Sequence, residues 1–205
     1  MTPPTSLTAL VLNCTLTPSP ESSSTELLAR QLLAALEEQG AGGDLVRVVD
    51  HDVRFGVSTD EGRGDAWPSI RQQVLAADIV VIATPVWMGQ PSSVTKMVLE
   101  RLDAELSETD EQGRMTTYDK VGLVAVVGNE DGAHHVSAEV YQALNDTGFS
   151  LAPNAVTYWV GQAMQGTDYQ DLEATPEETD SATRMAARNA VHLTRLLKSE
   201  PYPAG

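Results

Sequence analysis

The 205-residue chain is poor in cysteine, in basic residues and in aromatic residues, and each shortage excludes a class of protein. The single cysteine, Cys14, excludes an intramolecular disulfide and any zinc or iron–sulfur site built from several cysteines of one chain. Thirteen Lys and Arg stand against 29 Asp and Glu, which gives a formal net charge of −16. Because such a charge repels nucleic acid and anionic membrane surfaces, we expect neither as a partner. We interpret the acidity as an aid to solubility, with an acidic docking face as the alternative.

Long apolar runs are also absent. No stretch approaches the roughly 18 apolar residues of a membrane span, and the N-terminal residues lack the basic and apolar segments of a secretory signal. With a single cysteine, which fits a reducing compartment, this favours a cytoplasmic location. The length and the 41% hydrophobic content predict one domain over residues 1–205, with flexible ends at residues 1–5 and 200–205.

Short apolar runs alternate with amphipathic helical patterns along the chain. Strands are predicted at residues 7–12, 45–49, 79–83, 121–127 and 155–160. None alternates cleanly between apolar and polar residues, which is typical of parallel strands covered on both faces. Helical stripes occupy residues 28–36, 70–77, 94–102, 136–144 and 185–197. The alternation predicts an α/β fold, a doubly wound three-layer sandwich whose five-stranded parallel sheet has the order 2-1-3-4-5.

Residues typical of helix ends and of surface loops lie where this division predicts them. Gly40, Gly42 and Gly43 are predicted to end the first helix. Thr175 is predicted to cap the last helix, with Pro176 at its first position. The polar stretches at residues 50–65, 107–119 and 161–175 are interpreted as surface excursions.

Open α/β sheets bind ligands outside the carboxyl ends of their strands, so the loops after residues 12, 83 and 127 are the candidate site. The first loop is rich in hydroxyl groups: Thr15, Thr17, Ser22, Ser23, Ser24 and Thr25. Hydroxyls and free amide groups at a helix N-terminus can bind a phosphate without lysine. The alternative is that Ser23 caps the helix in a capping box with Glu26 and the other hydroxyls fill a flexible loop. The sequence has neither a GxGxxG nor a GKS/T motif, which disfavours dinucleotide and triphosphate sites.

The second loop, TPVWMGQPSS, suits a planar heterocycle. Trp87 offers a flat apolar face, Gly89 permits close backbone approach, and Ser92 or Ser93 caps the next helix. Ordinary packing against a helix or a subunit is the alternative for Trp87. The third loop, VGNEDGAHHV, has a backbone able to surround the far edge of such a ring. Its adjacent His134 and His135 point about 100° apart on a helix, so we expect surface or capping residues instead of metal ligands.

Together the three loops resemble those of the flavodoxin-like NADPH-dependent FMN reductase family, with its relatives among NAD(P)H:quinone oxidoreductases and azoreductases. The stretch TPVWMGQPSSVTKMVLERLD is the most specific match, and GNEDGAHHV is similar to the third loop of one branch of the family. The resemblance extends from about residue 7 to about residue 198. Many members begin the first loop with Gly-Ser and a basic residue, whereas this chain has Asn13, Cys14 and Thr15.

The resemblance implies a flavodoxin-like fold that binds FMN. The first-loop hydroxyls named above would hold the FMN phosphate. The ring would lie between two sets of residues: Pro85, Val86, Trp87, Met88 and Gly89 on one side, and Gly128, Asn129, Glu130, Asp131 and Gly132 on the other. No catalytic side chain and no metal is required, since flavin carries the chemistry. The implied activity is a ping-pong cycle in which NAD(P)H passes a hydride to bound FMN, and a quinone, flavin or azo acceptor is then reduced.

Two rival functions remain at the level of sequence. A flavodoxin-type electron-transfer carrier would use the acidic surface as a docking face for its redox partner. A chain that had lost its cofactor would act as a binding module. The resemblance also implies a homodimer or homotetramer, to which Trp67, Trp159, Tyr158 or Tyr169 would contribute contacts with a neighbouring ring pocket, if they do not lie in the core.

Overall fold

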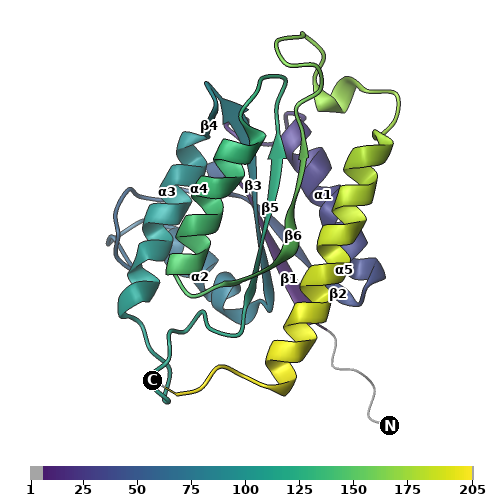
Figure 1. Ribbon diagram of the computed structural model, residues 1–205. Coiled ribbons are helices and arrows are strands. Elements are labelled where there is room, and N and C mark those ends of the chain that lie inside the picture. The colour runs from purple at the N-terminus through teal and green to yellow at the C-terminus, as the bar shows by residue number, and fades with distance from the viewer. Residues whose placement is uncertain (1–6, 205) are drawn as a thin grey trace.

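The computed structural model describes residues 7–204 and forms a three-layer α/β sandwich (Figure 1). Its parallel strands are β1 (Leu7–Asn13), β2 (Ala41–Arg47), β3 (Ile79–Trp87), β5 (Val121–Val127) and β6 (Ser150–Trp159). They lie in the order β2-β1-β3-β5-β6, and the two-residue β4 (Gln90–Pro91) pairs antiparallel with the end of β3. Apart from this small addition, the order is the predicted 2-1-3-4-5, so the flavodoxin-like fold class is confirmed. Residues 1–5 and 205 of the predicted flexible ends lie outside the described residues.

Two apolar cores cover the two faces of the sheet. On one face α1 (Ser24–Glu38) and α5 (Glu177–Ser199) pack against alternate strand residues such as Val11, Val81 and Leu123. On the other face the intervening strand residues contact α2 (Trp67–Ala76), α3 (Ser93–Leu102) and α4 (Ala133–Asp146). Because both faces of β1, β3 and β5 are buried, their sequences are continuously apolar, as expected for central parallel strands. No helix in residues 7–204 is both long and apolar enough to cross a bilayer.

Both predicted ends of the second strand were wrong. The second strand begins at Ala41, because Gly42 and Gly43 belong to β2 and do not end α1; only Gly40, with a φ of +92°, follows the helix in a left-handed conformation. A Cβ at Gly43 would lie 1.7 Å from the carbonyl oxygen of Ala9, so this strand residue must be glycine for β2 to pair with β1. Val48 and Val49, predicted as the end of this strand, belong instead to a 3₁₀ turn at Val48–Asp50.

The last strand and the last helix also differ from the prediction. β6 begins at Ser150 instead of residue 155, and its first half was missed because it contains Pro153 and a register shift opposite Gly122 and Val124. The N-cap of α5 is Pro176, without a side-chain hydrogen bond. Thr175 does not cap this helix, because its hydroxyl accepts a hydrogen bond from the Gln31 side chain at 2.8 Å.

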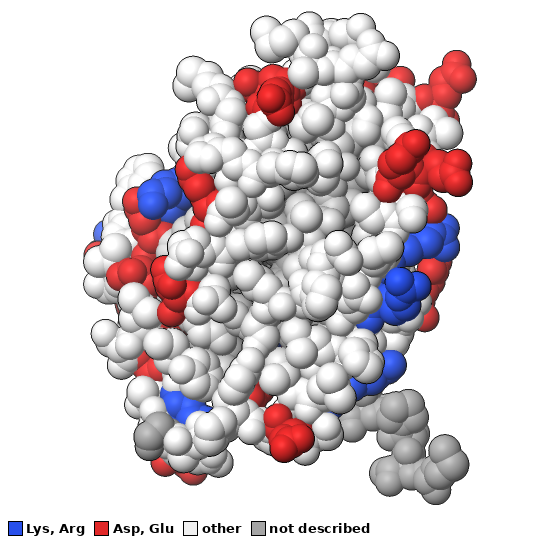
Figure 2. Space-filling model, in the orientation of Figure 1, with Lys and Arg blue, Asp and Glu red and all other residues white. Residues whose placement is uncertain are grey.

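The excursion between β2 and α2 is held by a buried ion pair. Arg101 of α3 donates to the carboxylate of Asp65 at 2.7 Å and to the carbonyl oxygens of Arg54 and Ser58, and both ionic side chains are fully buried. The Arg101 guanidinium also lies 5.6 Å from the ring centroid of Trp67. Trp67 is itself fully buried in the apolar core. On the face shown in Figure 2, which carries β6, the charged side chains lie mainly along the two flanks.

Candidate functional site

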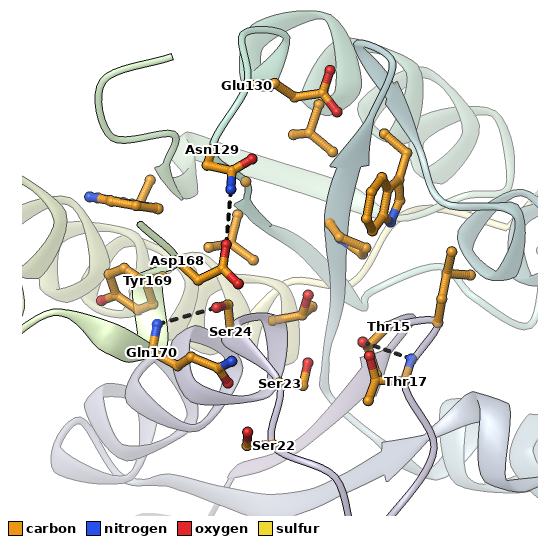
Figure 3. A pocket seen from close by; sticks show the side chains of 18 residues that line it. Thr15, Thr17, Ser22, Ser23, Ser24, Asn129, Glu130, Asp168, Tyr169 and Gln170 are labelled. Carbon is orange, nitrogen blue, oxygen red and sulfur yellow. Dashed lines mark hydrogen bonds between the residues drawn. The ribbon is translucent and has the colours of Figure 1, made fainter. Parts of the chain in front are cut away.

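A cavity of about 180 Å³ opens at the carboxyl ends of the strands (Figure 3). It collects most of the residues predicted from the three loops: Thr15, Thr17, Ser22, Ser23, Ser24, Thr25, Pro85, Val86, Trp87, Gly128, Asn129 and Glu130. Four predicted residues do not line it, namely Met88, Gly89, Asp131 and Gly132. The cavity is completed by residues that the sequence did not assign to it: Leu16, Val127, Trp159, Asp168, Tyr169 and Gln170.

The hydroxyl loop wraps the N-terminus of α1. Ser23 is the N-cap, and its Oγ accepts a hydrogen bond from the amide of Glu26 at 3.3 Å. The amides of Ser24 and Thr25 have no acceptor within residues 7–204. Unpaired amides at the positive end of a helix attract an anion. Capping and lining are therefore compatible roles for Ser23, because it caps the helix and also faces the cavity.

The second half of the expected capping box is absent, because the Glu26 side chain has other partners. Its carboxylate accepts hydrogen bonds from Arg47, at the end of β2, and from Arg30. Burial alone would raise the pKa of Glu26, but these two guanidinium groups outweigh it and hold the pKa below its usual range. Arg47 also donates to the carbonyl oxygens of Thr17 and Glu21, at 3.3 and 2.9 Å. Arg47 thus holds the backbone of the first loop at Thr17 and Glu21, and the Glu26 carboxylate balances its positive charge.

A buried chain of hydroxyl groups fixes the bases of the first two loops. Ser92, the N-cap of α3, donates from Oγ to the carbonyl oxygen of Cys14 at 2.6 Å. Thr95 donates from Oγ1 to Thr84 at 2.7 Å, and Thr84 donates to the carbonyl oxygen of Pro85 at 3.0 Å. The strand ends that precede the hydroxyl loop and the Trp87 segment are therefore joined through Ser92 and Thr95 at the N-terminus of α3. The sequence suggested Ser92 as a cap but gave no indication of this network.

Cys14 itself is fully buried at the start of the first loop. Burial raises the pKa of its thiol to about 12. Since the thiolate is the reactive form, this cysteine is inert near neutral pH. Cys14 is therefore a core residue and not a reactive thiol.

The second predicted loop is a β-hairpin, in which Trp87 pairs with Gln90 across a two-residue turn. Met88 and Gly89 form the turn with φ values of 52° and 71°, as a type I′ turn requires. Trp87 remains 53% exposed at the cavity, whereas Met88 points away and is 88% exposed. The Met88 amide donates to the Glu130 carboxylate at 2.9 Å, which ties the hairpin to the third loop.

Gly89 and Gly132 place these two loops in contact with each other instead of lining the cavity. Gly132 has a φ of +132°, and a Cβ there would lie 2.8 Å from the Cα of Gly89. The close approach expected for Gly89 is therefore made to a neighbouring loop. Asp131 turns its carboxylate toward the amide of Gly132 at 2.8 Å, which explains its absence from the cavity.

The two histidines diverge as expected. His134 packs edge-on against Tyr158, with 5.2 Å between ring centroids, and His135 lies 2.9 Å from both Gln90 and Glu139. Neither lines the cavity. In the described part of the chain, His, Cys, Asp and Glu side chains nowhere gather in threes as metal ligands would.

The remaining wall comes from the long loop after β6, which includes the 3₁₀ turn η3 (Tyr169–Asp171). Asn129 donates to the Asp168 carboxylate at 2.9 Å, and the Gln170 amide donates to Ser24 Oγ at 3.2 Å. Trp159 packs against Tyr169, with 5.3 Å between ring centroids. Trp159 and Tyr169 thus line a cavity of their own chain. The position of this loop after a strand, at the same edge of the sheet, was the signal that would have identified it.

The charge and donor set of the cavity fit a phosphate monoester carrying a hydroxylated chain. None of the Lys or Arg side chains lines it, and its two carboxylates belong to Glu130 and Asp168. Phosphate oxygens would therefore be bound by neutral hydroxyl and amide donors, while hydroxyl groups of the ligand can donate to the carboxylates. One buried acceptor, Oε1 of Gln170, has no hydrogen-bond partner. Such an orphaned atom at a cavity wall is consistent with a ligand that supplies a donor.

Comparison with known proteins agrees with this geometry. A sequence model of the family described as NADPH-dependent FMN reductase matches residues 8–165. The 8-demethyl-8-aminoriboflavin-5'-phosphate synthase of Streptomyces davaonensis is 34% identical over an alignment that covers 96% of this chain and 80% of that protein. The crystal structure of RosB with the bound intermediate 8-demethyl-8-formylriboflavin-5'-phosphate has a TM-score of 0.87 at 34% identity, covering 96% of this chain and 82% of that one.

A second relative in sequence is much longer. The divalent metal cation transporter MntH of Mycobacterium bovis is 36% identical over 94% of this chain. The aligned region covers only 29% of that protein, so this chain spans about three tenths of it.

Proposed function

The chain belongs to the NADPH-dependent FMN reductase family, and from that premise we propose that it is an FMN-dependent NAD(P)H oxidoreductase acting on a small-molecule acceptor. The observation that carries the proposal is the cavity itself. It brings the unpaired amides at the N-terminus of α1, the first-loop hydroxyls and the exposed face of Trp87 to one edge of the sheet. These groups match the phosphate and the planar ring of FMN.

The size of the cavity suggests how FMN would lie. Pockets that enclose a drug-sized ligand usually measure roughly 300–1,000 Å³, whereas this one measures about 180 Å³. The enclosed part suits the phosphate and the sugar chain. The ring would then lie at the mouth against Trp87, where a second substrate can reach it.

Bound FMN would supply the two-electron redox chemistry, and the side chains of this protein would bind and orient it. Ser22 to Thr25 would hold the phosphate, Asp168 and Glu130 would accept hydrogen bonds from the sugar hydroxyls, and Trp87 would support the ring. The hairpin contact between Met88 and Glu130 would keep Trp87 at a fixed distance from the third loop. No step requires a side-chain nucleophile.

The nicotinamide donor and the acceptor are the finer parts of the proposal. A reducible acceptor such as a quinone, a flavin or an azo compound would enter at the same mouth after the nicotinamide leaves. Of the arginines near loops, Arg47 is paired with Glu26, and Arg114 is paired with Asp110 and Asp119. Since no Lys or Arg of the described residues lines the cavity, the cavity itself supplies no cation to select NADPH over NADH.

Anaerobic reduction tests the proposal. Purified protein loaded with FMN is mixed with NADPH or NADH without oxygen, and the visible flavin absorbance is followed. The proposal expects rapid bleaching, followed by recovery when a quinone is added. A flavin band that persists with both nicotinamides would refute the reductase activity and favour a flavodoxin-type carrier.

A second candidate function follows from the similarity to the Streptomyces davaonensis synthase. The structural match to RosB, at a TM-score of 0.87, extends over almost the whole chain. By analogy with the name of that relative, the flavin phosphate would be a substrate that is chemically changed instead of a retained cofactor. Mass spectrometry of the flavin recovered after incubation with candidate co-substrates distinguishes the two: an unchanged mass supports the reductase, and an altered ring supports the synthase.

A further inference from the structure

The turn η3, which forms one wall of the cavity, places the Gln170 side chain beside the N-terminus of α1. The backbone amide of Gln170 donates to Ser24 Oγ at 3.2 Å, so this residue sits directly beside the hydroxyl loop. Figure 3 shows its carboxamide extending along the same side of the cavity as Ser22 and Ser24. Gln170 therefore borders the region in which a ligand phosphate would lie.

The position of Gln170 is fixed by contacts on both sides. Tyr169 donates its hydroxyl to Gln31 Oε1 at 2.6 Å, which anchors the turn to α1. Asp168 accepts from Asn129 at 2.9 Å, which anchors it to the third loop. These contacts fix the backbone that carries Gln170 beside the cavity before a ligand arrives.

Gln170 nevertheless leaves one strong acceptor unused. Its Oε1 is buried and has no hydrogen-bond partner, which is rare in folded proteins. No Lys or Arg lines the cavity, and no group of the described residues donates to this oxygen; the Oγ atoms of Ser23 and Ser24 themselves accept hydrogen bonds from backbone amides. A ligand hydroxyl would supply the missing donor.

We propose that Gln170 is a specificity-determining residue that recognises the phosphate-bearing end of the flavin, and this inference rests on the proposed function. A carboxamide both accepts and donates hydrogen bonds. Its oxygen would accept from the last hydroxyl of the sugar chain, and its NH₂ group would donate to a phosphate oxygen. Gln170 would thus favour FMN over riboflavin, without any cationic side chain.

The test is a charge change that keeps the shape of the side chain. Gln170→Glu replaces the donor by a second acceptor and places a negative charge beside the phosphate. Affinity for FMN and for riboflavin is measured by quenching of flavin fluorescence on titration with protein. We expect FMN affinity to fall at least about tenfold, which corresponds to the loss of one charge-assisted hydrogen bond, while riboflavin affinity changes less than about threefold.

Two further variants make the test decisive. Gln162→Glu adds the same charge to the same loop at an exposed side chain that does not line the cavity, and it should leave both affinities unchanged. Gln170→Leu removes both hydrogen-bonding groups without adding charge and should also weaken FMN more than riboflavin. Circular dichroism and thermal melting confirm that each variant is folded.

The outcomes separate this inference from the proposed function. If the unmodified protein fails to quench FMN fluorescence, the proposed function itself fails. If it binds FMN and Gln170→Glu binds FMN equally well, or loses FMN and riboflavin to the same extent, the role of Gln170 is refuted. An equal loss caused by Gln162→Glu would also refute it, because the effect would then come from total charge.

Discussion

At the scale of single residues, the side chains found from the sequence and those missed differ in how they reach the cavity. Ser22, Ser23 and Ser24 lie at the start of the helix that follows a buried strand, a local pattern that the sequence displays directly. Gln170 reaches the cavity through long-range contacts of its turn, such as the bond from Tyr169 to Gln31, a residue 138 positions away. A pattern of residue types does not encode so distant a contact. The sequence could therefore predict the hydroxyl loop, and the position of the loop after β6 at the same edge of the sheet, but it could not single out Gln170.

The buried pair of Asp65 and Arg101 makes a pH-dependent contribution to stability. Burial alone would raise the pKa of Asp65, but the backbone amides of Glu61, Trp67 and Arg54 and the Arg101 side chain outweigh it and lower the pKa to about 2. In the unfolded chain the pKa is about 3.9. Because the folded value is the lower one, the contribution is complete above about pH 4 and is lost as the pH falls toward 2.

We predict that Asp65→Asn lowers the free energy of unfolding by about 3–5 kcal/mol at pH 7, since it leaves the Arg101 charge buried without a counter-ion. The variant should also lose part of the decrease in stability between pH 4 and pH 2. Urea unfolding at several pH values measures both effects. The control is Glu100→Gln, which breaks an exposed pair with Lys96 at 3.8 Å and should cost at most about 1 kcal/mol. Equal stabilities of the two variants at pH 7 would contradict the account.

At the scale of elements, the sequence predicted central strands well and strand ends poorly. Val121–Val127 is buried on both faces throughout, so its apolar run and its hydrogen-bonded length coincide. β3 continues four residues beyond its predicted end at Ala83, because Pro85 and Trp87 remain extended and Trp87 pairs with Gln90. A segment with proline and glycine is read from sequence as a loop, and only the pairing with β4 makes it a hairpin.

The contact between that hairpin and the third loop gives a prediction for Gly132. Gly132→Ala would place a Cβ 2.8 Å from the Cα of Gly89, at a φ of +132°. We expect a loss of about 1–3 kcal/mol in the free energy of unfolding, together with weaker FMN binding because the hairpin that carries Trp87 is displaced. Urea unfolding and fluorescence titration measure the two effects.

The matched control for this prediction is Gly42→Ala. Gly42 lies in β2, and a Cβ there would meet no atom within 4 Å. This variant should keep both the stability and the FMN affinity of the unmodified protein. If Gly132→Ala behaves like Gly42→Ala, the two loops do not position each other.

At the scale of the whole molecule, the order of the sheet was predictable because topology follows from the alternation of strands and helices. Right-handed crossovers leave few ways to stack five such units, and the short β4 does not alter them. The sequence predicted the net charge of the molecule but not where the charges lie. The net charge of −16 is a property of composition, but the absence of every Lys and Arg from the cavity depends on pairs such as Arg47 with Glu26.

This distribution predicts how salt affects reduction by NADPH. Protein and nicotinamide are both anionic, and raising the ionic strength from 0.01 to 0.15 M shortens the Debye length from about 30 to about 8 Å. The second-order rate constant for bleaching of bound FMN should therefore rise several-fold over this range in stopped-flow measurements. A rate constant that falls with salt would indicate a cationic nicotinamide site and contradict this part of the account.

The central claim is that neutral donors at the start of α1 bind the phosphate of a flavin whose ring lies against Trp87. Its most direct test is a comparison of FMN and riboflavin in one fluorescence titration of the unmodified protein, since the two ligands differ only in the phosphate. The account predicts that FMN binds at least about tenfold more tightly, as a charge-assisted hydrogen bond to phosphate requires. Equal affinity for the two flavins, or no binding of FMN, would contradict it.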